Sequence, residues 1–211
     1  MIFLRHKRIR FFSIVDNYSS LYSYSDHKTQ LTVSAGIVNF IWNQWNLFWR
    51  EFWIAYVSGG IDFNNNIINP IYPDYDDQQS CAYLLYLCGK RKHYLPGDRI
   101  TGSCQEATWG DPKIIIEIAS HINTTNNSYD MCYLLGLISN YQNQINHFKQ
   151  IRNCFIHLNN ENVRNLSNIA NYYIFSPDQK LIDILETTNF NEHKRCFNYL
   201  IDNLSGMIKN L

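Results

Sequence analysis

The longest regular pattern of hydrophobic positions runs from Leu31 to Val57 and repeats every three or four residues, which predicts an α-helix. One apolar stripe on this helix consists of Ile37, Ile41, Phe48, Phe52 and Tyr56, and a second one of Val38, Trp42, Trp45, Trp49, Trp53 and Val57. A narrow polar strip remains, made of Asn39, Asn43, Asn46 and Arg50. A helix that is apolar around most of its circumference buries more than one face. We therefore expect one face to meet the domain core and the other to meet a second subunit or the inserted segment that follows.

Five further helices are predicted downstream. The first lies within residues 78–93 and ends at a glycine, and the second begins at Pro112 with Asp111 as its cap. The third begins near Ser128 and ends at Arg152. The apolar positions of the last two are Val163, Leu166, Ile169 and Tyr173 for one, and Phe197, Leu200, Ile201, Leu204, Ile208 and Leu211 for the other.

Residues 59–110 are predicted to be an insertion of loops around the short helix. Its turn-forming residues include Gly59, Gly60, Pro70 and Pro73. No alternating pattern of comparable length competes with the helices, so the predicted fold class is an all-α bundle with this insertion after the first long helix. Asp74, Asp76 and Asp77 precede the short helix, where carboxylates usually cap a helix and favour its dipole; binding of a cation is the alternative.

Residues 1–30 are rich in serine, tyrosine and basic side chains and have no clear period. We expect an irregular N-terminal arm here, with a short strand or a poorly ordered tail as the two alternatives. Residues 31–211 are then one helical domain. The first residues contain no uninterrupted apolar stretch followed by a cleavage site, so a signal peptide is not expected.

Composition limits the classes of partner. The 18 basic and 18 acidic side chains balance, so no overall field attracts the protein to nucleic acid, and any RNA binding must be local. The six cysteines have no CxxC or zinc spacing, which favours a reduced, cytoplasmic protein. The long helix has the length of a membrane span, but polar and charged residues near its middle argue against one, and no membrane contact is expected.

The sequence RNCFIH, from Arg152 to His157, is the strongest candidate site. A guanidinium presents a planar fork of donors to a phosphate, and an imidazole is the usual proton carrier near neutral pH. The spacing alone is not specific. Its context is more informative, because the pair closes a long amphipathic helix and the polar run HLNNEN opens the next one.

This context resembles the HEPN domains of prokaryotic defence and toxin systems, whose motif is Arg-x(4 to 6)-His, often R-N-x-x-x-H, at the junction of two helices. The resemblance covers residues 30–185 and is strongest from Trp109 to Leu166. It implies a HEPN-like helical bundle, a homodimer, and a metal-independent endoribonuclease of a toxin or antiviral system that cuts RNA at a cleft between two subunits. The motif maps onto Arg152, Asn153 and His157.

The implied chemistry needs no cofactor and no metal. His157 would take the proton from a ribose 2′-hydroxyl or donate one to the leaving oxygen, and Arg152 would stabilise charge on the phosphate. Asn153 lies one helical turn before His157, where it can orient the imidazole or bind a phosphate oxygen. The other histidines lie on polar faces, at helix ends or in irregular stretches, where solvated or capping roles are expected.

Two other functions remain open. One is a non-catalytic HEPN-like module that dimerises and binds RNA or a partner protein; the other is a helical interaction protein in which the motif is accidental and His157 packs against its own domain. An antitoxin or a neighbouring defence protein is a possible partner of a toxin. Some toxins of the family carry a tyrosine two residues after the histidine, which a partner enzyme modifies, whereas this chain has Asn159.

Overall fold

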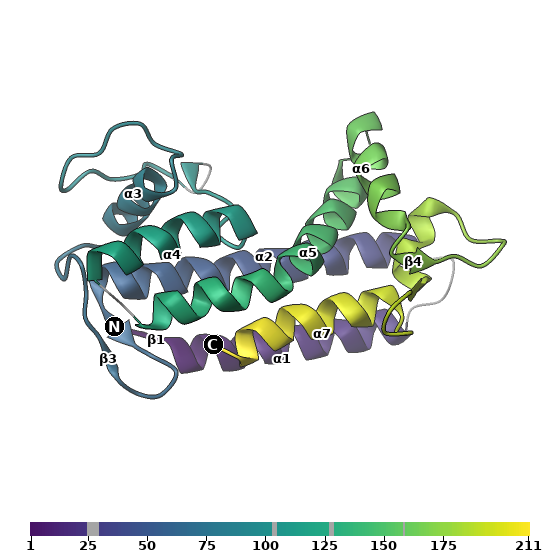
Figure 1. Ribbon diagram of the computed structural model, residues 1–211, viewed down its shortest axis with the longest axis horizontal. Coiled ribbons are helices and arrows are strands. Elements are labelled where there is room, and N and C mark those ends of the chain that lie inside the picture. Colours follow the sequence, from purple (N-terminus) through teal and green to yellow (C-terminus); the bar gives the residue numbers. More distant parts are fainter. Residues whose placement is uncertain (25–29, 103–104, 127–128, 158) are drawn as a thin grey trace. The chain divides into compact units, whose positions relative to one another are not determined.

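The computed structural model describes residues 1–24, 30–102, 105–126, 129–157 and 159–211. The fold is all-α, as predicted. Its helices are α1 (Leu4–Tyr24), α2 (Gln30–Ser58), α3 (Asp77–Leu87), α4 (Pro112–Asn126), α5 (Tyr129–Ile156), α6 (Asn160–Ala170) and α7 (Cys196–Lys209) (Figure 1). The short elements are β1 (Ile2–Phe3), β2 (Gly60–Ile61), β3 (Ile67–Ile68), β4 (Tyr173–Ile174), the 3-10 helix η2 (Leu181–Glu186) and β5 (Thr188–Asn189).

The chain packs as two compact units, each built from separate stretches of sequence. Unit 1 contains residues 1–11, 45–140 and 211, and unit 2 contains residues 12–44 and 141–210. Helices α1, α2 and α5 each contribute one part to unit 1 and the other part to unit 2.

The N-terminal region is helical, so the expectation of an irregular arm over residues 1–30 was wrong for Leu4–Tyr24. Four apolar side chains of α1 are fully buried: Leu4, Phe11, Val15 and Tyr22. Their separations of seven, four and seven residues place them on one side of a helix. Serine, tyrosine and basic residues occupy most other positions, which hides this narrow stripe from a reading of composition.

In unit 1 the tryptophans of α2 are buried by the chain itself. Trp45, Trp49 and Trp53 are fully buried, and the ring of Phe11 lies 6.2 Å from that of Trp45. The Trp45 indole donates a hydrogen bond of 2.8 Å to the carbonyl of Gly110. A Cβ at Gly110 would lie 2.2 Å from Trp45 Nε1, so only glycine allows this approach. Of the two expected covers, the inserted segment is the one observed, and a second subunit is not needed for this face.

The insertion contributes α3 and two strands of a small sheet, whose third strand, β1, comes from the N-terminus. Strand β1 pairs in parallel with β2, and β2 pairs antiparallel with β3, so that Ile2 faces Gly60 and Gly60 faces Ile68. The predicted short helix is confirmed as α3. Asp76 is its cap: the carboxylate accepts from the amides of Gln78 and Gln79, which confirms the capping interpretation of this acidic residue.

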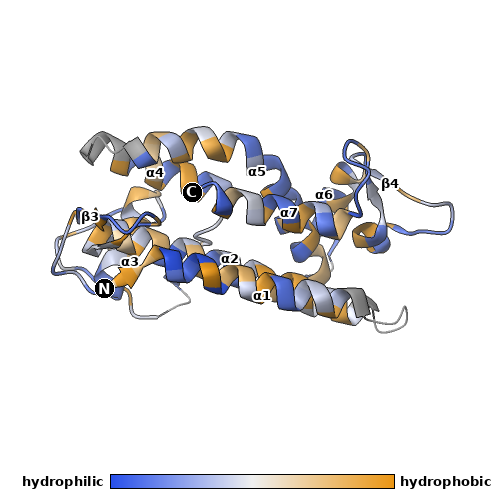
Figure 2. Cartoon of the chain, turned by 90° about the horizontal axis from the view of Figure 1, so that it is seen from below, coloured by the Kyte–Doolittle hydropathy of each residue, from blue (hydrophilic) through white to orange (hydrophobic). Residues whose placement is uncertain are grey.

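Unit 2 contains the second half of α5, where hydrophilic residues gather (Figure 2), followed by α6, η2 and α7. Helices α6 and α7 both pack on η2, and β4 pairs antiparallel with β5. The helix predicted at the C-terminus is confirmed as α7, whose buried side chains include Phe197, Leu200 and Leu204. Among the described residues, no helix combines the length and apolar character that crossing a bilayer requires.

Candidate functional site

The Arg152 guanidinium is held by two carboxamides near the C-terminus of α5. Its Nε donates to Asn39 Oδ1 at 3.0 Å, and its Nη1 donates to Asn153 Oδ1 at 3.0 Å. Within the described residues Arg152 forms no ion pair. Partial burial lowers the pKa of its guanidinium, and no anion among those residues raises it again. A fixed, uncompensated positive charge of this kind is suited to an anionic ligand.

The Asn153 side chain orients the Arg152 guanidinium and does not orient the His157 imidazole. Its side-chain oxygen accepts from Arg152, and among the described residues no hydrogen bond joins it to the His157 ring. Its backbone carbonyl accepts from the His157 amide at 2.9 Å, which extends helical geometry past the last residue of α5. The sequence suggested that Asn153 orients the imidazole or binds a phosphate oxygen, and in the structure its side chain contacts the arginine.

The junction between α5 and α6 is tied by two asparagines. Asn159 caps α6, because its side chain accepts from the Asn162 amide at 2.8 Å. The Asn162 side chain donates to the carbonyl of His157 at 2.6 Å. These two contacts fix the start of α6 and hold Asn162 against the backbone of His157.

The His157 side chain is exposed and forms no hydrogen bond within the described residues. The hypothesis that the motif is accidental expects His157 to pack against its own domain. The exposed side chain does not agree with that expectation. Residues five apart on a helix are separated by about 140° around its axis, since each residue turns about 100°. The side chains of Arg152 and His157 therefore leave the backbone in different directions. Helix geometry alone does not bring them to the same point in one chain.

His147, ten residues earlier on α5, has a different environment. It is buried, and its Nδ1 lies 3.0 Å from the hydroxyl of Tyr173. Burial lowers the pKa of His147 to about 4, so its ring is neutral at pH 7. The expected solvated or capping role was wrong for this histidine, because it packs under β4 instead of on a polar surface.

Searches against protein-family models, curated proteins and solved structures found no match to this chain.

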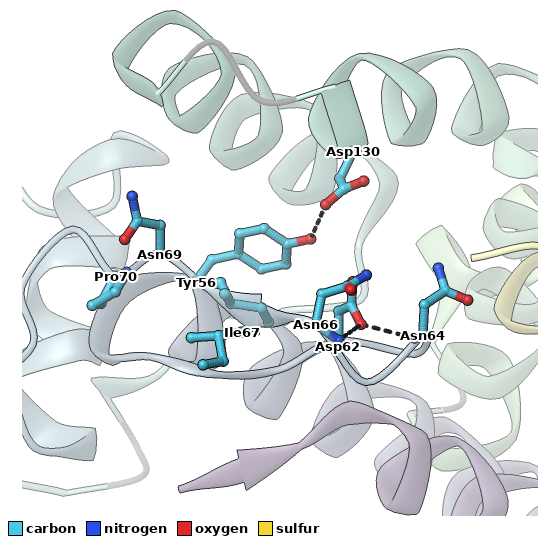
Figure 3. A pocket seen from close by; sticks show the side chains of 9 residues that line it. Tyr56, Asp62, Asn64, Asn66, Ile67, Asn69, Pro70 and Asp130 are labelled. Carbon is cyan, nitrogen blue, oxygen red and sulfur yellow. Dashed lines mark hydrogen bonds between the residues drawn. The ribbon is translucent and has the colours of Figure 1, made fainter.

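A second polar site lies in unit 1, where a hollow of about 490 Å³ is bordered by Tyr56, Asp62, Asn64, Asn66, Ile67, Ile68, Asn69, Pro70 and Asp130 (Figure 3). The Tyr56 hydroxyl donates to Asp130 at 3.2 Å. The Asp62 carboxylate already accepts from the amides of Asn64 and Asn66. These bordering residues include two carboxylates and no cation, so the charge of the hollow disfavours phosphate. In the described part of the chain, no three histidine, cysteine, aspartate or glutamate side chains gather as metal ligands.

Sequence reasoning missed Asn39 and Asn162. Asn39 belongs to the polar strip of the long helix, and a polar residue on so apolar a helix is a signal that a buried partner exists. That partner lies 113 residues away in the sequence, so the signal does not identify it.

Proposed function

We propose that this protein is a metal-independent endoribonuclease of the HEPN type, acting in a toxin or antiviral defence system in the cytoplasm. The observation that carries the proposal is the Arg152 guanidinium, which is held by Asn39 and Asn153 without an anionic partner in the described residues. An exposed imidazole follows it at the end of the same helix. A guanidinium and an imidazole are the kinds of group that transesterification of RNA needs, one for charge stabilisation and one for proton transfer.

In the proposed reaction the ribose 2′-oxygen attacks the adjacent phosphorus and the bond from phosphorus to the 5′-oxygen breaks. One imidazole removes the 2′-hydroxyl proton, and a protonated one supplies a proton to the departing 5′-oxygen. The products are a 2′,3′-cyclic phosphate and a 5′-hydroxyl. Arg152 stabilises the charge that grows on the non-bridging phosphate oxygens. DNA lacks the attacking hydroxyl and is not cut.

A homodimer supplies what one chain does not. Because Arg152 and His157 diverge around the helix, one copy does not direct both toward the same phosphate. Two copies related by a two-fold axis contribute two imidazoles, one as base and one as acid, and two guanidiniums. We expect light scattering at micromolar concentration to give twice the mass of the chain, and a strictly monomeric mass would contradict this arrangement.

Single-turnover cleavage of a mixed-sequence RNA tests the activity. The substitution His157→Ala removes a proton carrier and is expected to slow cleavage roughly a hundredfold or more. His121→Ala is the matched control, since His121 is also exposed on a helix but lies on α4 in unit 1. EDTA is expected to leave the rate unchanged, and RNA with a 2′-deoxy substitution is expected to remain intact.

The outcomes separate the candidate functions. Parent activity that survives His157→Ala would contradict the catalytic assignment. If the parent binds RNA but cuts none over a broad panel of substrates, the protein is a binding module instead. Growth arrest on expression in a bacterial host, relieved both by His157→Ala and by a neighbouring gene product, would identify a toxin and its antitoxin.

A further inference from the structure

We propose that unit 1 carries a docking platform for single-stranded RNA at the C-terminal end of α3 and on the segment that follows it. The platform consists of Tyr86, Lys90, Lys92 and Tyr94, together with Lys113 at the start of α4. The choice of RNA over another polyanion rests on the function proposed above, whereas the platform itself lies outside the unit that holds Arg152 and His157.

The platform begins with a pair of stacked tyrosines. The rings of Tyr86 and Tyr94 lie 5.8 Å apart with 25° between their planes, and Tyr86 is 46% exposed. The Tyr94 hydroxyl donates to that of Tyr75 at 2.7 Å, and its ring lies 5.3 Å from that of Tyr83. Tyr86 thus rests on a supported ring and is itself about half exposed. An exposed ring held in this way is a surface on which an unpaired base can stack.

Cationic residues separate the two tyrosines along the chain. The sequence GKRKHY, from Gly89 to Tyr94, places three cations between them. Arg91 is neutralised by Asp98 at 2.7 Å, but Lys90 and Lys92 are exposed and form no ion pair within the described residues. The chain as a whole has no net charge, so a local cluster of this kind is what could attract a phosphate backbone.

A hollow of about 420 Å³ extends from the platform, with Lys90 and Lys113 on its border. Two acidic residues also line it, but both are engaged. The Glu106 carboxylate binds Arg50 at 2.8 Å, and Asp111 accepts from the Lys113 amide at the start of α4. With Glu106 paired to Arg50, the two lysines outnumber the one remaining carboxylate, Asp111, which keeps its charge. Cations near the end of α3 also favour its helix dipole, but this explains neither the exposed tyrosine nor Lys113, which belongs to another helix.

The combination favours single-stranded RNA over a duplex or an acidic protein. The bases of a duplex are already stacked on one another, so an exposed tyrosine ring adds no stacking contact to them. An acidic peptide would use the lysines but gains little from Tyr86. Single strands use both, through phosphates and unpaired bases.

Fluorescence anisotropy with a short labelled RNA tests the platform, using full-length protein that carries Arg152→Ala and His157→Ala so that the probe stays intact. Lys90→Glu with Lys92→Glu is expected to weaken binding at least tenfold. The double substitution Lys90→Ala and Lys92→Ala is expected to lower the slope of log affinity against log salt by about 1.4, which is about 0.7 for each lost phosphate contact. Lys180→Glu with Lys209→Glu gives the same change in charge on unit 2 and is expected to have little effect.

The substitution Tyr86→Ala isolates stacking. We expect a loss of affinity of about fivefold to a hundredfold, the range measured for single base stacks. Tyr133→Ala is the control, since Tyr133 is 47% exposed on α5 and lies outside the platform. Equal loss from both tyrosine variants, or unchanged affinity in both lysine variants with parent-like melting temperatures, would overturn the platform. Equally tight binding of duplex RNA or of a polyglutamate peptide would also overturn it.

The result is independent of the proposed ribonuclease activity. If the parent cuts RNA but no platform variant changes affinity, the platform is wrong and the cleavage site stands. If the platform variants lose RNA but the parent never cuts it, the platform stands and the catalytic proposal fails.

Discussion

Two arginines on long helices, one in each unit, show how differently this protein uses the same side chain. Arg50 in unit 1 donates from Nε to both oxygens of Glu106, at 3.0 and 2.8 Å, and from Nη1 to Asp77 at 3.3 Å. Arg152 in unit 2 meets only amide oxygens, from Asn39 and Asn153, within the described residues. Both are partly buried and fixed in position, but only one has its charge balanced.

The pKa shifts of the two guanidiniums follow this difference. Burial alone lowers the pKa of both. At Arg50 the hydrogen bonds and charges of Glu106 and Asp77 outweigh burial and raise the pKa overall. At Arg152 burial acts without such an offset, so the pKa is lowered. A carboxylate partner balances the charge of a buried arginine within the fold. A carboxamide partner orients the guanidinium but leaves its positive charge able to bind an anionic ligand.

The largest expected effect on stability comes from Arg50→Ala. This change leaves the Glu106 carboxylate, which is 16% exposed, without its cation. Unpairing a buried charge costs about 3–5 kcal/mol, and partial exposure reduces this to about 2–3 kcal/mol. We expect the melting temperature to fall by about 5–10 °C. Parent-like melting of Arg50→Ala would show that the ion pairs are not structural.

A second contrast is that between His147, which is buried on α5, and His157, which is exposed just after that helix, and His147→Gln tests it. Because the pKa of His147 is about 4 in the folded protein and about 6.5 when unfolded, the unfolded chain binds more protons between these values. Stability is therefore lost as pH falls from about 6.5 towards 4, by roughly 2–3 kcal/mol.

The His147→Gln variant does not titrate at this position, so its denaturation curves should lose less stability than the parent between about pH 7 and about pH 4.5. The introduced carboxamide would keep a polar group facing the Tyr173 hydroxyl, which separates titration from the loss of a hydrogen bond. Identical pH dependence in both proteins would contradict the buried, neutral state of His147.

Substitutions at Asn39 can give Arg152 an anionic partner of the kind that Arg50 has. Asn39→Ala removes one of the two acceptors of Arg152, and we expect cleavage to slow about tenfold because the guanidinium loses its orientation. Asn39→Asp gives Arg152 an anionic partner like that of Arg50. We expect it to slow cleavage further while the melting temperature stays equal or rises. Faster cleavage by the aspartate variant would show that the neutral partner is not needed.

Much of the helical framework could be predicted from sequence because its signals are local. The start at Pro112, the cap at Asp76 and the long apolar pattern from Leu31 to Val57 all depend on neighbouring residues, and each corresponds to an observed element. Helix α1 escaped prediction because four buried positions are spread over 21 residues that are mostly polar.

The candidate site depends on contacts between residues far apart in the sequence, and these could not be predicted. Arg152 and His157 could be singled out because their side chains have distinctive chemistry and lie close together in the sequence. The polar strip of the long helix could also be recognised in the sequence, but the residues that hydrogen-bond to it could not. Asn39 binds Arg152, Asn46 binds the Gly110 amide and Arg50 binds Glu106, each across at least 56 residues. Such pairings are set by packing of distant segments, which periodicity does not encode.

We propose that the charge of Arg152 serves a phosphate and not the fold. The most direct measurement compares Arg152→Ala with the parent in single-turnover RNA cleavage, with thermal melts of both. We expect the rate to fall a hundredfold or more, because charge stabilisation at the phosphate is lost, while stability changes by no more than about 1 kcal/mol. If Arg152→Ala instead cuts at the parent rate, or destabilises the protein as much as Arg50→Ala, then Arg152 is a second structural arginine and the account is wrong.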